Sequence, residues 1–306
     1  MRVIPIVVVD DTALAASNVP ETDYAAWAIG TTYAADARVI SVATHSIYQS
    51  VAGGNLGNDP TDAANIVTAA NPTGAWLYVS KTNRWRAFDG SNSAITSQAT
   101  SITYTLNAAR TSDIIAFMGV IGDTVRVRVV DATSATVYDV TRDLVDTTGI
   151  TTYFAYATFA FDDYTPNVIF YGIPSYPGTT LLIDIVSGAT ASVAMIGYGA
   201  RRVIGKTLEG TMPSIIDYST KEVDVFGETN IVKRAFAKTV SFNVGFPTST
   251  YLSTSRALEP LRSTAAIYYE DEDLTHDLIV LGFYTDYSPQ LTTNYTLATI
   301  EITGVI

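Results

Sequence analysis

Apolar and polar residues alternate along much of the chain, most clearly in the segment TVRVRVV. There Val125, Val127 and Val129 fall on one face, and Arg126 and Arg128 fall on the other. Such alternation is typical of a β-strand with one buried face. Many similar runs rich in Thr, Val, Ile and Tyr are separated by Gly, Pro, Asn and Asp, which predicts further strands. We therefore expect a mainly β protein.

Helical periodicity is rare. The best candidate is TSTYLSTSRALEPLRST, in which Tyr251, Leu252, Leu258 and Leu261 could share one face, and Pro260 would weaken the last turn. The segment TDAANIVTAAN predicts a weaker helical turn. These observations predict one short helix in the last third of the chain.

Shifts in pattern divide the chain into four parts. Residues 1–19 begin with the apolar segment MRVIPIVVVD and predict an N-terminal strand or arm. Residues 20–90 hold all three tryptophans and predict a small aromatic-rich β-module. Residues 91–204 carry many alternating strands, which predicts a jelly-roll-like β-sandwich. Residues 205–306 predict a loop arm followed by a C-terminal α+β unit with the short helix.

The connection over residues 205–231 is long for a loop inside a compact domain. It contains apolar side chains that an isolated loop would leave in water, at a cost of about 25 cal/mol per Å². We therefore expect a binding element, with Ile216, Tyr218 and Phe226 as contacts to another subunit.

Composition narrows the function. The chain has 306 residues, and its 30 acidic residues against 18 basic ones give a net charge of −12. That balance argues against duplex DNA or an anionic membrane as the main partner. The chain has no cysteine, and no apolar run approaches the length of about 20 residues that spans a bilayer. We expect neither nucleic-acid binding nor membrane insertion.

Catalytic patterns are poor. The two histidines, His45 and His276, are interpreted as surface residues, and no Gly-x-Ser-x-Gly turn, phosphate-binding loop or dinucleotide fingerprint occurs. We therefore predict that the protein is not an enzyme and carries no cofactor. A cell-wall or polysaccharide hydrolase is the weakest of the alternatives, because no segment resembles a catalytic domain.

Several carboxylates stand in groups. Asp10 and Asp11 form one group, Asp162 and Asp163 another, and residues 270–273 a third that we interpret as a solvated hairpin turn. Oxygen ligands for calcium could also cluster at four residues, namely Asn55, Asn58, Asp59 and Asp62. None of these groups has the EF-hand spacing, so no metal site is predicted.

The basic residues Lys233, Arg234 and Lys238, with Arg201 and Arg202, are too sparse for a nucleic-acid surface. We expect them to pair with acidic residues of a neighbouring subunit, which would steer assembly.

A series of aromatic, glycine and proline residues in the second part of the chain has a recognisable order. It consists of Tyr24, Trp27, Gly30, Tyr33, Val39, Tyr48, Pro60 and Trp76. The series resembles the chitin-binding type modules that are attached to secreted polysaccharide hydrolases. Asp36-Ala37 departs from the Gly-Asp of that family, and QSVAGGNLG stands where the family usually has exposed aromatic residues.

Two interpretations of these aromatics stay open. Trp27, Tyr33 and Trp76 could be the core of a domain too small to be held by aliphatic residues alone. Alternatively, Tyr48, Trp76 and Tyr78 could form a shallow carbohydrate-binding site, because sugars stack on flat aromatic faces.

The order of parts over nearly the whole chain resembles tail-tip and baseplate proteins of long-tailed bacteriophages, most characteristically in NRWRAFDG and DYSTKEVDVFG. The resemblance implies a structural component of the virion tail, made in the cytoplasm of the host bacterium. It also implies contacts with other tail proteins and homo-oligomers within the virion. The alternative function is a glycan-binding module on the tail that recognises a host-surface receptor.

Overall fold

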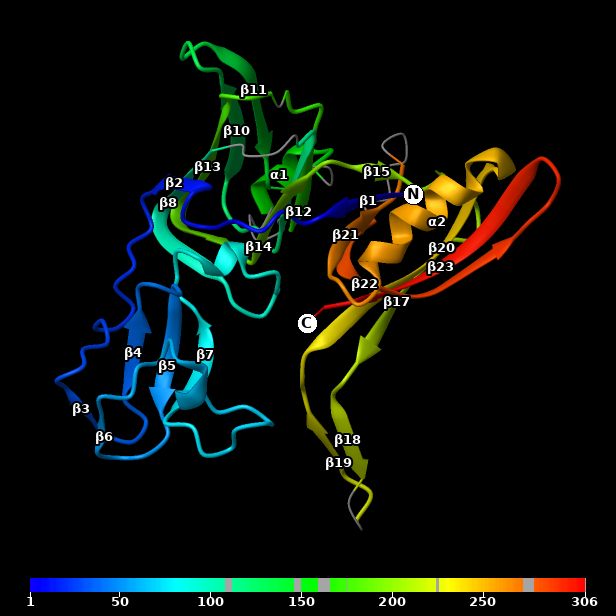
Figure 1. Cartoon of the computed structure of the whole chain (residues 1–306). Helices are drawn as coiled ribbons and strands as arrows, with labels where there is room; N and C mark the ends of the chain where they lie inside the picture. The colour runs from blue at the N-terminus through cyan, green and yellow to red at the C-terminus, as the bar shows by residue number, and fades with distance from the viewer. Residues whose placement is uncertain are drawn as a thin grey trace.

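The computed structural model describes residues 1–107, 112–145, 150–158, 166–174, 176–223, 226–271 and 278–305. Strands take up 51% of the chain and helices 9%, which confirms the predicted mainly β class. The strands build an aromatic-rich module, a two-sheet sandwich and a large sheet from which a long hairpin projects (Figure 1).

The module contains a three-stranded antiparallel sheet of order β4-β5-β7 and a short ladder between β3 and β6. Its elements are β3 (Thr32–Tyr33), β4 (Arg38–Ser41), β5 (Ser46–Ser50), β6 (Asn55–Leu56), η1 (Ala63–Asn65) and β7 (Trp76–Lys81). The weak helical turn predicted in TDAANIVTAAN corresponds to the single 3₁₀ turn η1. The Asp62 carboxylate caps this turn by accepting a hydrogen bond from the amide of Ala64.

The sandwich pairs a five-stranded sheet of order β11-β10-β13-β8-β2 with a three-stranded sheet of order β12-β9-β14. The predicted two-sheet arrangement is thus present. Its strands are β2 (Leu14–Ser17), β8 (Thr96–Asn107), β9 (Ile114–Met118), β10 (Thr124–Val130), β11 (Thr136–Asp143), β12 (Asn167–Tyr171), β13 (Thr180–Val193) and β14 (Met195–Gly199). The short helices η2 (Arg86–Phe88) and α1 (Tyr153–Thr158) accompany it.

The large sheet has the order β15-β1-β21-β22-β23-β20-β16, and β17 pairs with β20 at one end. Its strands are β1 (Arg2–Pro5), β15 (Arg202–Val203), β16 (Lys206–Thr207), β17 (Met212–Asp217), β20 (Phe236–Pro247), β21 (Ala266–Tyr269), β22 (Ile279–Gln290) and β23 (Tyr295–Gly304). The N-terminal strand β1 therefore lies between strands from the last third of the chain. Residues 1–19 do not form a part of their own, because β1 joins the large sheet and β2 joins the sandwich.

The three-stranded sheet is buried on both faces. One face packs on the five-stranded sheet, where Ile196 and Tyr198 of β14 join the main sandwich core. The other face packs on the large sheet, where Met195 of β14 meets a second core that includes Ile4 and Ile267. A strand covered on both sides needs no polar face, which explains the continuous apolar run IIAFM of β9.

The predicted helix is present as a continuous helical stretch that covers the free face of the large sheet (Figure 1). It runs through η3 (Thr248–Thr250), α2 (Tyr251–Leu258) and η4 (Glu259–Leu261). Leu258 and Leu261 are buried as predicted, but Leu252 points to solvent and Thr254 is buried instead. Among the described residues, no helix has the length and apolar content needed to cross a bilayer.

Residues 212–238, which we call the arm, form a β-hairpin, so the loop that the sequence predicted over residues 205–231 is largely paired in strands. β17 pairs with the first half of β20, and β18 (Thr220–Val223) pairs with β19 (Thr229–Val232) towards the end of the hairpin. Gly227 has a φ of 85°, a backbone conformation that glycine adopts without strain, in the connection between β18 and β19. The arm projects away from the body of the chain (Figure 1).

Candidate functional site

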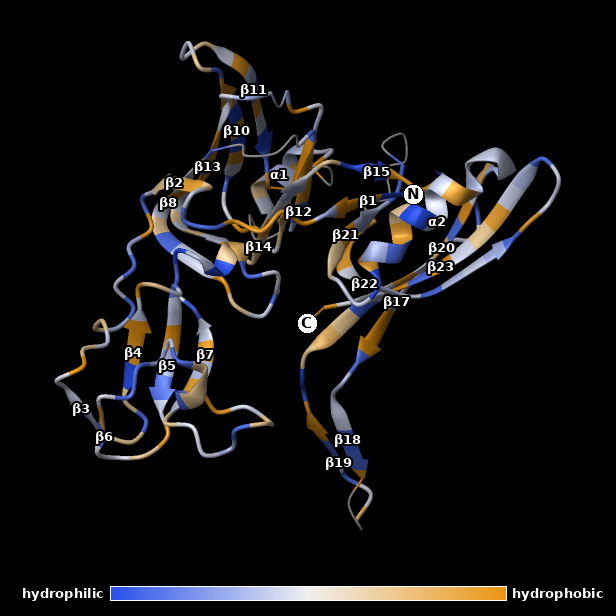
Figure 2. Cartoon of the chain, in the orientation of Figure 1, coloured by the Kyte–Doolittle hydropathy of each residue, from blue (hydrophilic) through white to orange (hydrophobic). Residues whose placement is uncertain are grey.

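The arm has an unusual surface, because its large apolar side chains are exposed along its whole length. The exposed set is Met212, Ile215, Ile216, Tyr218, Val223, Phe226, Ile231, Val232 and Phe236. It includes all three residues that the sequence predicted as assembly contacts, and Phe226 reaches 88% exposure. Figure 2 shows hydrophobic segments along β17 and β19. Apolar patches of this kind on soluble proteins commonly mark interaction surfaces.

The exposed apolar residues lie on both faces of the hairpin. Successive residues of a strand point to opposite faces. Ile215 and Ile216 are neighbours in β17, and Ile231 and Val232 are neighbours in β19, so each strand places apolar side chains on either side. A hairpin resting on its own body would show a covered face and a polar face. In β17 and β19 every side chain is exposed, and apolar side chains occupy both faces.

The basic residues that the sequence grouped together are separated in space. Arg201 forms an ion pair with Asp113 at 2.8 Å, and Arg202 donates a hydrogen bond to the carbonyl of Ala257 at the helix. Lys233, Arg234 and Lys238 are exposed on the arm. The prediction of one basic group is therefore wrong for Arg201 and Arg202, which bond to Asp113 and Ala257 of the same chain.

The aromatic residues of the module are packed together. Trp76 is 0% exposed, its indole N–H donates to the carbonyl of Asn58 at 2.8 Å, and its ring meets Tyr33 edge-on at 5.3 Å. Trp27 and Tyr33 are partly buried against the same cluster, which also contains Tyr48. The structure thus brings Trp27, Tyr33 and Trp76 into one core.

This packing corrects the carbohydrate platform suggested by the sequence. Trp76 is fully buried and Tyr48 is 7% exposed, so neither ring can stack on a sugar. Of the three proposed residues, only Tyr78 is exposed, at 47%, between Leu77 and Val79 on β7. One exposed ring on a strand remains where three had been expected.

The possible calcium ligands in the module serve local turns. Asn58 donates to the side chain of Asn55, and Asp59 accepts bonds from the amide and hydroxyl of Thr61. Asp62 caps η1. Among the residues that the structure describes, no group of three or more His, Cys, Asp or Glu side chains could hold a metal ion.

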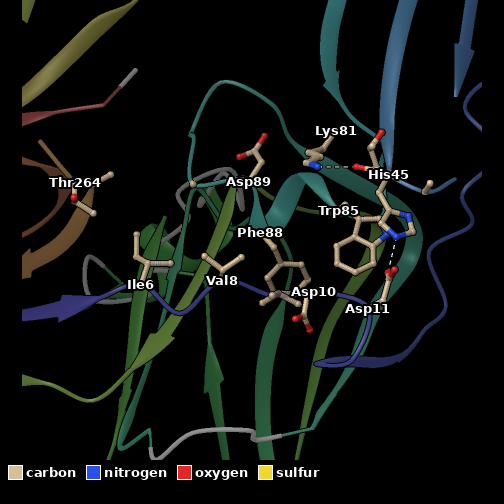
Figure 3. A pocket seen from close by; sticks show the side chains of 15 residues that line it. Ile6, Val8, Asp10, Asp11, His45, Lys81, Trp85, Phe88, Asp89 and Thr264 are labelled. Atoms are coloured by element: carbon tan, nitrogen blue, oxygen red, sulfur yellow. Dashed lines mark hydrogen bonds and ion pairs between the residues drawn. The ribbon is translucent and has the colours of Figure 1, made fainter. Parts of the chain in front are cut away.

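A cleft of about 730 Å³ lies where the module, the sandwich and the chain before β21 meet (Figure 3). His45, at the turn between β4 and β5, stacks on Trp85 with ring centroids 4.2 Å apart. Its Nε2 lies 2.5 Å from a carboxylate oxygen of Asp11, and its Nδ1 lies 2.9 Å from one of Glu21. The sequence interpretation of His45 as a surface residue is wrong, since it joins three separate segments.

The arrangement around His45 does not match a nucleophilic triad. In such a triad one imidazole nitrogen faces a hydroxyl or thiol and the other faces a carboxylate. Here carboxylates face both nitrogens, so the imidazole has no nitrogen left for a nucleophile. The sequence offered no sign of this contact, because Asp11 and Glu21 are far from residue 45 in the chain.

Other charged side chains of the cleft also form hydrogen bonds within the chain. Lys81 donates from its ammonium group to the carbonyl of Thr44 at 2.7 Å. Burial raises the pKa of Asp89, although the amide of Ser91 and the positive charges of Lys81 and Arg86 oppose the shift. Asp10 accepts bonds from the amides of Thr12 and Ala13, which fixes a turn.

The acidic group at residues 270–273 is only partly described. Glu270 is buried, and Asp271 binds the α-amino group of Met1 at 2.8 Å. The expected solvated turn is therefore wrong for these two residues. Five residues considered in the sequence lie outside the described ranges, namely Asp162, Asp163, Glu272, Asp273 and His276.

A comparison of the chain with protein-family models gave no match, and a comparison with curated proteins gave none either.

Proposed function

We propose that the protein is a structural component of the tail tip or baseplate of a long-tailed bacteriophage, and that it assembles with other tail proteins through its arm. One observation carries the assembly role: a projecting hairpin exposes apolar side chains on both faces. Burying that surface against another subunit would stabilise the assembly by about 25 cal/mol per Å² of apolar area removed from water. The setting in a phage tail rests on the resemblance of the sequence.

The location can be tested on purified phage particles that contain this chain. An antibody against β10 and β11 of the sandwich should label the tail tip in negatively stained images, because these strands lie away from the arm (Figure 1). Label on the capsid, along the whole tail shaft or on no part of the particle would reject the proposal.

The alternative is a glycan-binding module used in host adsorption, and the exposed ring of Tyr78 is the observation that favours it. A single stacked ring with a few hydrogen bonds supports only weak binding, with a dissociation constant of about 1 mM. Titration with chitin or peptidoglycan oligomers tests this candidate. Micromolar binding that Tyr78→Ala abolishes would favour receptor recognition over a purely structural role.

A further inference from the structure

The cleft between the module and the sandwich has an apolar wall (Figure 3). Ile6 and Val8, from the segment that links β1 to β2, form this apolar wall together with Phe88 of η2. Val8 is 79% exposed, although its neighbours Val7 and Val9 pack on the sandwich core. A ligand that covers the apolar wall would remove this surface from water, which favours binding.

The cleft has the size of a ligand site. Its volume of about 730 Å³ lies within the range of about 300–1,000 Å³ that is common for small-molecule pockets. Such pockets are mainly apolar, contain a few polar groups that orient the ligand, and often lie where domains meet. This cleft lies where the module, the sandwich and the chain before β21 meet, and every residue that lines it is described by the structure.

The charged groups of the cleft are mainly acidic. The carboxylates of Asp10, Asp11 and Asp89 line it, together with the ammonium group of Lys81. His45 also lines the cleft, but both of its ring nitrogens face carboxylates. The cleft therefore carries an excess of negative charge, which attracts a cation.

Asp89 is the carboxylate that is most available to a ligand. The other two have roles within the chain, since Asp10 fixes the turn that follows it and Asp11 binds His45. The Asp89 carboxylate accepts a hydrogen bond from the amide of Ser91 at 2.8 Å. Burial raises the pKa of Asp89, so its charged form is less favourable here than in water and gains from a cation beside it.

The positive groups near Asp89 are engaged elsewhere. Lys81 donates to the carbonyl of Thr44 at 2.7 Å, and Arg86 pairs with Asp23 at 3.4 Å. Their charges oppose the rise in the pKa of Asp89 but do not cancel it. Among the residues that the structure describes, none forms an ion pair with Asp89.

We propose that this cleft binds an organic amine, whose ammonium head pairs with Asp89 and whose apolar body lies on the apolar wall. The charge-assisted hydrogen bond orients the head. The apolar wall supplies much of the affinity, because an ion pair that is partly open to water stabilises little. A carboxylic acid of the same shape would meet the like charge of Asp89. The site shares no residue with the arm, so it goes beyond the assembly role.

Three probes with one phenylethyl body test the proposal, namely phenethylamine, phenethyl alcohol and hydrocinnamate. Methyl NMR titrations should show saturable shifts at Ile6 and Val8 with phenethylamine, and no shift at Val127 in the sandwich core. The amine should bind at least about fivefold more tightly than the alcohol, because only the amine adds a charged hydrogen bond, and hydrocinnamate should bind most weakly. Equal binding of the three probes, or no saturable shift at Ile6 and Val8, would overturn the proposal.

Two substitutions of Asp by Asn test the role of Asp89. Asp89→Asn keeps the shape and an acceptor for the amide of Ser91, and should reduce the preference for the amine over the alcohol to less than about twofold. Asp143→Asn, at an exposed position on β11 away from the cleft lining, removes the same charge and should keep the preference. A preference that survives Asp89→Asn, in a variant whose methyl spectrum shows the parent fold, would overturn the pairing.

Val8→Ser tests the apolar wall. It should weaken the binding of phenethylamine by about threefold, because apolar area is lost from the contact. The fold should tolerate the change, since Val8 is 79% exposed. Unchanged binding of phenethylamine to this variant would contradict the placement of the apolar body.

Discussion

The backbone oxygen of Pro5 lies so close to Gly199 that a Cβ atom on residue 199 would be 2.5 Å from it. Pro5 ends β1 of the large sheet, and Gly199 ends β14 of the sandwich. The two sheets therefore approach more closely than side chains at this point would permit. This contact, between the first and the middle part of the chain, helps to fix the sandwich on the large sheet.

Gly199→Ala should lower the free energy of unfolding by about 1–3 kcal/mol, because the obstacle is backbone and cannot turn aside. Gly197→Ala should cost less, since its Cβ would meet the flexible end of Ile267, at 2.4 Å from Cδ1. Gly30→Ala is the control, because nothing lies within 4 Å of its Cβ position. Urea unfolding ranks the three variants by their loss of free energy of unfolding. Equal losses for Gly199→Ala and Gly30→Ala would contradict the close approach of Pro5 and Gly199.

In the module, Trp76→Ala should lower the free energy of unfolding of residues 20–90 by about 3–5 kcal/mol, because a fully buried indole is lost. Tyr78→Ala on the same strand should change it by less than about 0.5 kcal/mol, since that ring is half exposed. Thermal melts and limited proteolysis distinguish the two variants. A small loss of stability in Trp76→Ala would mean that the aromatic cluster does not stabilise the module.

His45→Ala should lower stability by about 1–3 kcal/mol, because Glu21 and Asp11 lose a hydrogen-bonding partner and Trp85 loses a stacked ring. Gln49→Ala lies on the same hairpin, where its side chain bonds to Arg38 and Asp36 at the surface, and should cost less than about 0.5 kcal/mol. Chemical unfolding compares the stabilities of the two variants with that of the parent. Equal stabilities would show that the His45 contacts do not join the module to the segment before β2.

Asp271 gives the large sheet a pH-dependent contribution. Burial alone raises the pKa of Asp271, but the α-ammonium group of Met1, the amide of Thr207 and the charge of Arg2 outweigh it, so the pKa lies below its ordinary value of 3.8. Burial also lowers the pKa of the Met1 amine despite Asp271, so it is the carboxylate whose charged form the fold favours. The stability that it contributes is present above its unfolded pKa and is lost as the pH falls through the folded value.

Asp271→Asn should therefore destabilise the protein by about 1–3 kcal/mol near pH 7, and the difference from the parent should shrink in acid as the parent carboxylate becomes protonated. Glu259→Gln, at an exposed position of the helical segment, controls for the change in charge. Unfolding curves at several pH values provide the comparison. A difference that stays constant down to about pH 2 would contradict this linkage.

Local pattern predicted much of the fold. The alternation of TVRVRVV placed Val125, Val127 and Val129 in the sandwich core, and helical spacing located α2. The packing of the large sheet on the second face of the three-stranded sheet could not be predicted in this way. A continuous apolar run such as IIAFM shows that both faces of a strand are covered, but not that its second cover includes Ile4 from the start of the chain.

The arm and the aromatic residues show where the same approach failed. Apolar side chains occupy both faces of the arm, so the alternation of a half-buried strand is absent, and the length of the connection over residues 205–231 and its Gly210, Pro213 and Gly227 favour a loop. Trp76 and Tyr78 are two residues apart on β7 and so share one face of a regular strand, and the pattern alone does not tell that only Trp76 is fully buried. Only the packing of the module shows that Trp76 lies in the core with Val39 and Tyr48 and that Tyr78 stays 47% exposed.

The central claim is that the arm is covered by another subunit, and amide hydrogen exchange over residues 212–238 tests it most directly. In the isolated monomeric chain, amides of β18 and β19 should exchange fast, because a two-stranded ladder in water opens readily, whereas β20 inside the large sheet should be protected. In the assembled particle, the amides of β18 and β19 should become protected while those of β23 change little. Equal, fast exchange of the arm in both states would contradict the claim.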